Sequence, residues 1–334
     1  MSILLSARAG CALLWVGLAL CACGTDTTPA SSGSSAGTGG KVGSTGGSGG
    51  DAGAANPSEQ SLETAQWPMP NSAGLGLPNG ASYDARSTPG VVHDEVTGLD
   101  WLQNPGVELY TRADALDWCE QLSFAGFDDW RVPEFIELVS LFDVEPNEAD
   151  PLDPIYIDPV FSAEGRFWSA YPVNGSGLGR LLDFTAAGCG MSERCSLGVA
   201  ANQDSALGGA FCVRNDAEPA TSQRYEVEGD AVTDSRTGLT WQGVPAAVQT
   251  VGYAEAVSAC EALGDGSRLP SITELLSILV PSLNTTAFLN WPVSAFAWSR
   301  SAISAKPGAY WTAAIGGATQ AAAASSHNRV QCVR

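Results

Sequence analysis

Two short segments of the chain repeat one pattern of apolar and polar positions, residues 97–105 (TGLDWLQNP) and residues 237–245 (TGLTWQGVP). In each segment two apolar residues stand two apart, and side chains at that spacing point to the same face of a strand. The stretch from Asp94 to Gly98 predicts a tight hairpin turn, because an Asp side chain caps backbone N–H groups and Gly adopts a positive φ. We therefore expect a strand that buries its apolar pair in each copy, Leu99 with Trp101 and Leu239 with Trp241.

Further along each copy, apolar residues recur every three positions, a spacing that is typical of one side of a helix. The matching sets are Leu116, Cys119 and Leu122 in the first copy and Val257, Cys260 and Leu263 in the second. The pattern predicts a helix that places its Cys on the buried stripe. A capping box at residues 271–274 (SITE) predicts the start of a second helix, and Pro133 suits the start of its counterpart in the first copy.

These segments belong to a longer internal repeat, in which Val92 aligns with Val232 at an offset of 140 residues. The match continues through a Cys-Glu pair, an Arg-Val-Pro or Arg-Leu-Pro segment followed by Glu-Leu, a Trp-Ser pair and a closing Cys-Val-Arg. The offset becomes smaller along the chain, so the second copy has lost loops. Helical and strand-like patterns within each copy predict an α+β fold, present in tandem.

The N-terminal segment carries a different pattern. After the early Arg8, an apolar run from Cys11 to Leu20 is too short to span a bilayer and is typical of a signal peptide. Residues 20–23 (LCAC) resemble a bacterial lipobox, so we expect residues 1–22 to be removed and Cys23 to carry lipid. Ordinary secretion with cleavage nearby is the alternative.

Residues 23–66 contain the lipidated Cys and a stretch rich in Gly, Ser, Ala and Thr without apolar periodicity. Such a composition cannot bury enough apolar surface to offset ordering, so we expect a disordered tether. Gly24 is a non-acidic residue after the lipid site, which favours the outer membrane in the lipoproteins that this segment resembles. The sequence therefore predicts a membrane attachment through the lipid, with the folded part held away from the membrane.

The charge balance narrows the range of partners. The chain has 36 Asp and Glu against 16 Lys and Arg, a formal net charge of −20. Binding of nucleic acid and other polyanions needs clustered Lys and Arg, so this composition disfavours them. From residue 67 on, the chain is long enough for two domains of ordinary size, which the repeat delimits as residues 67–217 and 222–334.

The nine cysteines reduce to six once Cys11, Cys21 and Cys23 are assigned to the signal peptide and the lipid. An even number in an exported protein predicts disulfides. Each copy has one Cys in its predicted helix and one near its end, so the predicted bridges are Cys119–Cys212 and Cys260–Cys332. The remaining two, Cys189 and Cys195, lie in a loop that the second copy lacks and predict a local third bridge. Pairing across the copies is the alternative, and it would require equivalent modules to use different bonds.

The repeated motifs, Asp-x-x-Thr-Gly-Leu-x-Trp, Arg-Val/Leu-Pro-x-x-x-Glu-Leu, Trp-Ser and Cys-Val-Arg, resemble the C-terminal domain family of the Legionella collagen-like adhesin, the Lcl C-terminal domain. The resemblance covers residues 67–215 and 223–334. It implies a C-type-lectin-like fold, with two helices packed on small twisted antiparallel sheets and long loops. It also implies adhesion, although the named adhesin binds sulfated glycans, which the acidity of this chain does not suit. A neutral polysaccharide or a surface protein is the expected ligand.

An acidic segment of the first copy contains Glu145-Pro146-Asn147, a tripeptide that supplies metal and sugar ligands in calcium-dependent lectins. Carboxylate and amide oxygens are the ligands that Ca²⁺ prefers, and the resulting hypothesis of a calcium loop comprises Asp143, Glu145, Asn147, Glu148, Asp150 and Asp153. The alternative is an acidic solvated loop. The second copy favours that alternative, because it reads PSLN at residues 281–284 in this region. No other cofactor is expected.

Further residues are weighed by their positions in the repeat. Glu137 and Glu274 match, and helix capping is their expected role rather than general acid catalysis. The two histidines, His93 and His327, are not equivalent and have no matched nucleophile, which disfavours a Ser-His-Asp or zinc site. The tryptophans expected in the core are Trp101, Trp168, Trp241 and Trp298. Trp118 and Trp291 lack counterparts and are the candidates for an exposed, ligand-binding ring.

Together these features predict a lipid-anchored outer-membrane or cell-surface protein that acts as a binding or adhesion module and is not an enzyme. The reason is that scaffold residues are duplicated while no reactive constellation is duplicated with them. Two alternatives stay open. One is an enzyme or enzyme accessory with redox-active cysteines, and the other is a purely structural envelope component.

Overall fold

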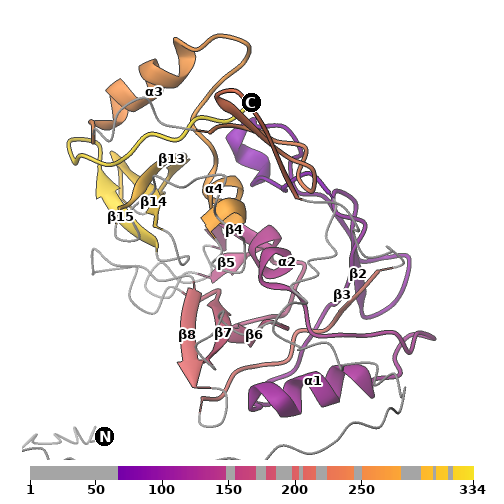
Figure 1. Ribbon diagram of the computed structural model, residues 1–334. Helices are drawn as coiled ribbons and strands as arrows, with labels where there is room; N and C mark the ends of the chain where they lie inside the picture. The colour runs from indigo at the N-terminus through magenta and orange to yellow at the C-terminus, as the bar shows by residue number, and fades with distance from the viewer. Residues whose placement is uncertain are drawn as a thin grey trace, which may run out of the picture. The chain divides into compact units, whose positions relative to one another are not determined.

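The computed structural model (Figure 1) describes residues 67–147, 155–170, 178–185, 198–202, 206–215, 224–243, 250–279, 295–303, 306–314 and 319–334. All of them belong to the unit Ala55–Arg334. They form a mixed α+β structure of short helices and small antiparallel sheets, as the alternation of helical and strand patterns predicts. The signal peptide, Cys23 and the tether lie outside the described residues.

A four-stranded antiparallel sheet opens the first copy. Its order is β1-β2-β3-β9, with β1 (Tyr83–Asp84), β2 (Val91–Asp94), β3 (Asp100–Leu102) and β9 (Val213–Arg214). β2 and β3 form the hairpin that the Asp-to-Gly turn predicts, with Val92 opposite Trp101. Leu99 and Trp101 are completely buried, as expected. Because β9 pairs with β3, the closing Cys-Val-Arg segment returns to the start of the copy.

Two helices and two further sheets complete the described part of the first copy. The helices are α1 (Arg112–Glu120) and α2 (Phe135–Ser140), and a short 3-10 helix, η2 (Ala73–Leu75), precedes β1. One sheet pairs β4 (Phe142–Asn147) with β5 (Ile155–Ile157), and the other has the order β6 (Arg166–Trp168), β7 (Leu178–Asp183) and β8 (Gly198–Asn202). The small sheets therefore follow the helices, in the strand-like last third of the copy.

The second copy repeats this order of elements. β10 (Tyr225–Glu228), β11 (Ala231–Asp234) and β12 (Thr240–Gln242) form a sheet, α3 (Tyr253–Glu261) and α4 (Ile272–Leu279) follow, and β13 (Ala297–Ala302), β14 (Ala309–Ala313) and β15 (Thr319–Ala323) form the last sheet. Val232 lies opposite Trp241, as Val92 lies opposite Trp101. Val333 makes an isolated antiparallel bridge to Trp241, at the place of the pairing of β9 with β3. Apart from the β4–β5 sheet, which has no counterpart among the described residues of the second copy, the two copies thus share one topology.

The buried stripe of the first helix in each copy differs from the predicted one. α1 buries Ala115 with Cys119, and α3 buries Ala256 with Cys260. Both helices end before the third predicted member of the stripe, and Leu263 is 51 % exposed. The cysteines were placed correctly on the buried side. The prediction was wrong for Leu263, because residues four apart share a helix face and this helix stops at Glu261.

The second helix of each copy starts with a capping box. In α4, the Glu274 N–H donates to Ser271 Oγ (3.1 Å) and the Ser271 N–H donates to Glu274 Oε2 (2.8 Å), which confirms the predicted box. In α2 the N-cap is Glu134, whose side chain and that of Glu137 make the reciprocal bonds. Pro133 therefore precedes the cap and does not open the first turn of the helix.

α2 and α4 lie side by side and join the two copies (Figure 1). Every residue of α2 is buried, and so are the residues of α4 from Ile272 to Ile278, the pattern of a helix surrounded by protein. Beside them the ring of Trp311 in β14 contacts two rings of the first copy edge to face, Phe142 at 5.7 Å and Tyr156 at 5.6 Å between centroids. One hydrophobic core therefore contains residues of both tandem domains.

The first described segment also connects the copies. The Thr273 hydroxyl of α4 donates to the carbonyl oxygen of Pro70 (3.0 Å), and Asn71 Nδ2 donates to Glu274 Oε1 (3.3 Å). The Val144 N–H of β4 donates to Ser72 Oγ (2.9 Å). Residues 70–72 are thus hydrogen-bonded to both copies. The repeat itself does not predict this role, because these residues precede its first aligned position.

Candidate functional site

The most recognisable repeated motif is a structural turn. Asp94 Oδ1 accepts hydrogen bonds from the backbone N–H groups of Val96 (2.9 Å) and Thr97 (3.2 Å). Gly98 and Gly238 have φ values of +71° and +70°, which a residue with a Cβ adopts only under strain. The motif that identifies the repeat therefore shapes the hairpin, and its buried Asp presents no free carboxylate to a ligand at the surface.

The two turns differ in what lies against the Asp. Arg224 donates from Nε and Nη2 to the two carboxylate oxygens of Asp234, both at 2.8 Å, and both side chains are buried. Ser82 has the equivalent place in the first copy. The Glu95 N–H donates to the Ser82 carbonyl oxygen, just as the Ser235 N–H donates to the Arg224 carbonyl oxygen. Without this guanidinium, burial raises the pKa of the Asp94 carboxyl above its ordinary value.

The matched glutamates have the expected capping role and, in addition, an ion pair. Glu137 accepts the Glu134 N–H (2.7 Å) and receives two bonds from Arg131, both 2.7 Å. Glu274 likewise receives two bonds from Arg268, both 2.7 Å. The pairing of these arginines with the glutamates was not predicted from the sequence. The signal was an Arg six residues before a Glu in both copies. Such a bidentate pair fixes the segment before each helix to the start of that helix.

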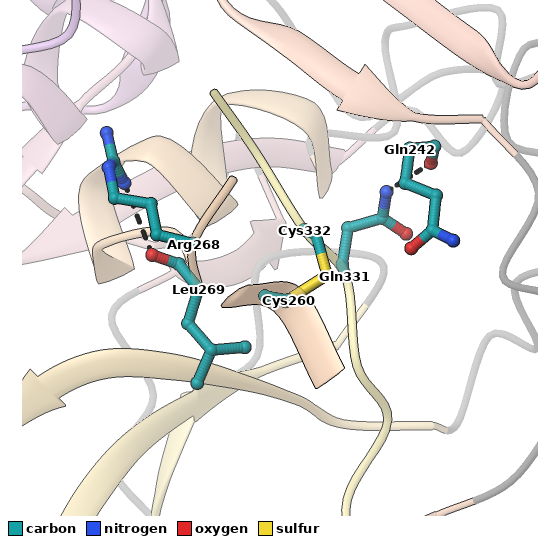
Figure 2. Close-up of a disulfide and its surroundings, with 6 residues drawn as sticks. All are labelled: Gln242, Cys260, Arg268, Leu269, Gln331 and Cys332. Atoms are coloured by element: carbon teal, nitrogen blue, oxygen red, sulfur yellow. Dashed lines mark hydrogen bonds between the residues drawn. A yellow bond between two sulfur atoms is a disulfide. The ribbon is translucent and has the colours of Figure 1, made fainter. Parts of the chain in front are cut away.

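A disulfide in each copy joins the first helix to the end of that copy. Cys119 of α1 is bonded to Cys212 and Cys260 of α3 to Cys332, with Cα–Cα distances of 5.6 and 5.4 Å. These are the pairings that the repeat predicts, and neither crosses between copies. Figure 2 shows the second bridge, beside which Gln331 Nε2 donates to the carbonyl oxygen of Gln242. Cys189 and Cys195 lie outside the described residues, so their bridge stays a prediction.

The repeated tryptophans are in the core. Trp101, Trp168, Trp241 and Trp298 are all 0 % exposed. The indole N–H of Trp168 donates to the Tyr110 carbonyl oxygen and that of Trp298 to the Val251 carbonyl oxygen, both at 2.8 Å. Trp118, expected to be exposed, is partly buried, with its ring 5.8 Å from that of Tyr110. Trp291 lies outside the described residues.

The calcium hypothesis rests largely on undescribed residues. Asp143 is partly buried in β4. The backbone of Glu145 and Asn147 belongs to the same strand, while their side chains and the whole of Glu148, Asp150 and Asp153 lie outside the described part. Within the described residues no group of three or more His, Cys, Asp or Glu side chains is arranged to hold a metal ion. His93 is exposed and pairs with Asp100 through Nδ1 and Oδ1, 2.7 Å apart.

Two surface cavities are candidate binding sites. One, of about 570 Å³, lies in the first copy between Asn104 and Val107 on one side and Ile157 and Phe161 on the other. The second, of about 450 Å³, lies in the second copy beside Cys332 and Trp241. Neither was foreseen from the sequence. Cavities form where distant segments fail to fill the space between them, and the local pattern does not report this.

The comparisons with known proteins agree with the internal repeat. A family model described as the Lcl C-terminal domain matches residues 90–194 and again residues 230–334. No curated protein sequence matches the chain. In the described part, none of the helices combines the length and apolar character needed to cross a membrane.

Proposed function

Because the chain belongs to the Lcl C-terminal domain family and carries that domain twice, we propose that it is a surface lipoprotein that binds a polysaccharide or a protein of the cell envelope or of another cell. The proposed role is non-catalytic. The lipid on Cys23 attaches the chain to the outer membrane, and residues 23–66 form the tether. Each domain has the C-type-lectin-like fold that the family resemblance implies.

The observation that carries this proposal is the division of roles between repeated and non-repeated residues. The turn aspartates, the Arg–Glu pairs, the disulfides and the core tryptophans recur in both copies and stabilise the scaffold. The copies differ in loops and in the cavities beside them. A fixed scaffold with variable loops is the usual arrangement of binding proteins, since specificity is carried by loops on a rigid frame.

Two further features support an exposed binding role. Disulfides are typical of proteins outside the cytoplasm, and this chain has one in each copy. The net charge of −20 disfavours polyanions, so a neutral glycan or a protein is the preferred ligand class. Two domains on one anchor raise avidity for a repetitive ligand when both engage it.

The test is a binding screen with the exported chain carrying Cys23→Ser, which keeps the disulfides and removes the lipid. We expect saturable binding to a neutral glycan or to a cell surface and weak binding to sulfated glycans. An acidic protein of similar net charge serves as the control for adsorption. Failure to bind any glycan, envelope fraction or cell surface contradicts the proposal, and so does a preference for sulfated glycans.

A thiol assay separates binding from redox chemistry. The mature chain is alkylated without reduction, and the labelled cysteines are identified by mass spectrometry. Cys23 can be labelled only where it carries no lipid. We expect no other cysteine to be labelled. Labelling of Cys189 or Cys195 would restore the redox-enzyme alternative.

A further inference from the structure

The cavity beside the second disulfide lies where the first copy has an aromatic cluster. The two places are equivalent because Arg131 and Arg268 make the same backbone hydrogen bond. The Arg131 N–H donates to the Val213 carbonyl oxygen and the Arg268 N–H to the Val333 carbonyl oxygen, both at 2.9 Å. Each Val follows the closing Cys of its copy. The residue before this Arg is Trp130 in the first copy and Ser267 in the second. A large ring in one copy is therefore replaced by a small hydroxyl in the other.

In the first copy the space is filled by the chain itself. Trp130 is 2 % exposed, and its ring lies 6.4 Å from that of Phe124 and 6.5 Å from that of Phe127. The cluster is packed so closely on the sheet that a Cβ at Gly90 would lie 2.7 Å from the Phe124 ring. Arg214 covers the other side, its guanidinium 4.0 Å from the centroid of Phe127.

In the second copy the segment that supplies these rings is shorter. Between the helix Cys and the Arg it has four residues fewer than in the first copy, and residues 261–267 read EALGDGS. No aromatic residue stands in it. The scaffold around it is nevertheless retained, because Asp265 holds Arg334 (3.3 Å) as Asp129 holds Arg214 (2.7 Å).

The result is the cavity of about 450 Å³, in which Leu263 presents an exposed apolar side chain, while the neighbouring side chains of Trp241 and Val333 are buried. Leu263 lies beyond the end of α3 and is 51 % exposed, and no aromatic ring of the segment 261–267 covers it. Two carboxylates, Glu228 and Asp230, also line the cavity and are themselves exposed. Asp230 takes the place of Gly90. The Gly243 N–H donates to the Asp230 carbonyl oxygen, and the Gln103 N–H donates to the Gly90 carbonyl oxygen in the same way.

We propose that this cavity binds an aromatic side chain of a partner protein, flanked in the partner by a basic residue. The ring takes the place of the first copy's own Phe and Trp side chains, against the exposed Leu263 and under the guanidinium of Arg334. An aromatic ring buries a large apolar area against a Leu side chain and attracts a guanidinium over its face. The basic residue pairs with Glu228 and Asp230. The vacated place in the second copy thus becomes the recognition pocket.

The inference deepens the proposed binding role by naming the chemistry of the partner, and it rests on that role. The probe is a set of capped tripeptides, lysine-tryptophan-lysine, lysine-alanine-lysine and glutamate-tryptophan-glutamate, titrated into the Cys23→Ser chain by calorimetry and ligand-observed NMR. We expect saturable binding of the lysine-tryptophan-lysine peptide, and binding of the alanine and glutamate peptides that is weaker by about tenfold or more.

Variants locate the binding. Ser267→Trp refills the cavity with the residue that the first copy uses and should weaken the tryptophan peptide by about tenfold or more. Ser258→Trp, on the exposed side of α3, is the matched control and should leave binding unchanged. Leu263→Ser removes only an exposed apolar side chain and should weaken binding without loss of folding.

Three outcomes would overturn the inference: no saturable binding of the tryptophan peptide, equal binding by Ser267→Trp, or competition by neutral methyl glycosides in place of peptides. The last outcome would make the cavity a sugar site and leave the proposed binding function intact. Conversely, if the screen of glycans, envelope fractions and cell surfaces finds no partner, the proposed function is contradicted even if the peptide binds. The two failures are therefore distinguishable.

Discussion

Equivalent residues in the two copies have the same role in the chain but different electrostatic surroundings. The buried aspartates of the two hairpin turns are the clearest case. Asp234 is held by a buried Arg224, whereas Asp94 has Ser82 at the corresponding place. Both cap the same turn, so the difference between them measures the effect of the guanidinium rather than of the turn.

Replacing each Asp by Asn keeps the side-chain oxygen that caps the turn and removes the charge. For Asp234→Asn we expect a loss of about 3 kcal/mol in the free energy of unfolding, because Arg224 stays buried without its carboxylate. For Asp94→Asn we expect a change below about 1 kcal/mol at neutral pH. Urea unfolding of both variants provides the measurement, and equal losses in the two would contradict this account.

The pH dependence of the first turn has a definite sign. Burial raises the pKa of Asp94 in the folded state, so the folded chain holds this proton more tightly than the unfolded chain does. Its contribution to stability is therefore fully present below the unfolded pKa of about 3.9 and is lost as the pH rises through the raised value. The stability of the wild type minus that of Asp94→Asn should fall with rising pH in urea titrations above pH 3. A flat or rising difference would refute the assignment.

At the scale of elements, each copy uses the same contacts to fix its second helix to the segment that precedes it. The glutamates cap the helix start and pair with an Arg that is itself bonded to the end of the copy through its backbone. The disulfide then fixes the first helix to the same end. One Glu side chain in each copy thus caps the helix and pairs with the Arg, which gives a structural reason for its recurrence.

The two Arg–Glu pairs should differ in strength. Arg268 is 16 % exposed as a side chain, whereas Arg131 is 34 % exposed and also donates to Asn215 Oδ1 (2.9 Å). Glu274→Gln therefore leaves a more poorly solvated cation than Glu137→Gln and should cost more, about 2–3 kcal/mol against about 1 kcal/mol. Thermal and urea unfolding of the two variants compare them directly. A larger loss for Glu137→Gln would contradict the ordering.

At the scale of the whole molecule, the tandem copies are coupled through their equivalent second helices and through a junction of aromatic rings. Trp311 of the second copy is fully buried and packs on Phe142 and Tyr156 of the first. A residue in one copy should therefore stabilise the other. We therefore expect the described part of the chain to unfold as one unit rather than as two modules in series.

The test of this coupling is Trp311→Ala, which removes the ring from the junction. We expect a loss of about 3–5 kcal/mol in the free energy of unfolding, as for other buried large-to-small changes. Hydrogen exchange should show lower protection in α2 and β5 of the first copy as well as in β14. Ser258→Trp on the exposed face of α3 is a control that should change neither region. Unchanged protection of α2 would indicate that the two copies unfold independently.

The sequence by itself determined the features that are local or that recur. The Asp-to-Gly turn, the capping box and the strand pair of Leu99 and Trp101 arise from side-chain chemistry over a few residues. Duplication gave the family relationship and the two disulfide pairings, since equivalent cysteines must use equivalent bonds. The extent of the helices was less well determined, as Leu263 shows, because a helix end depends on the residues after it and on the surface against which they pack.

The tertiary structure alone decided the features that depend on space between distant segments. It brought Arg224 onto Asp234, Trp311 onto Phe142 and α2 onto α4, none of which has a local pattern. It also showed that a Trp-to-Ser difference and a shorter segment leave a cavity beside Cys332. Periodicity reports which face of an element is apolar, but not which surface meets that face or whether the space between them is filled.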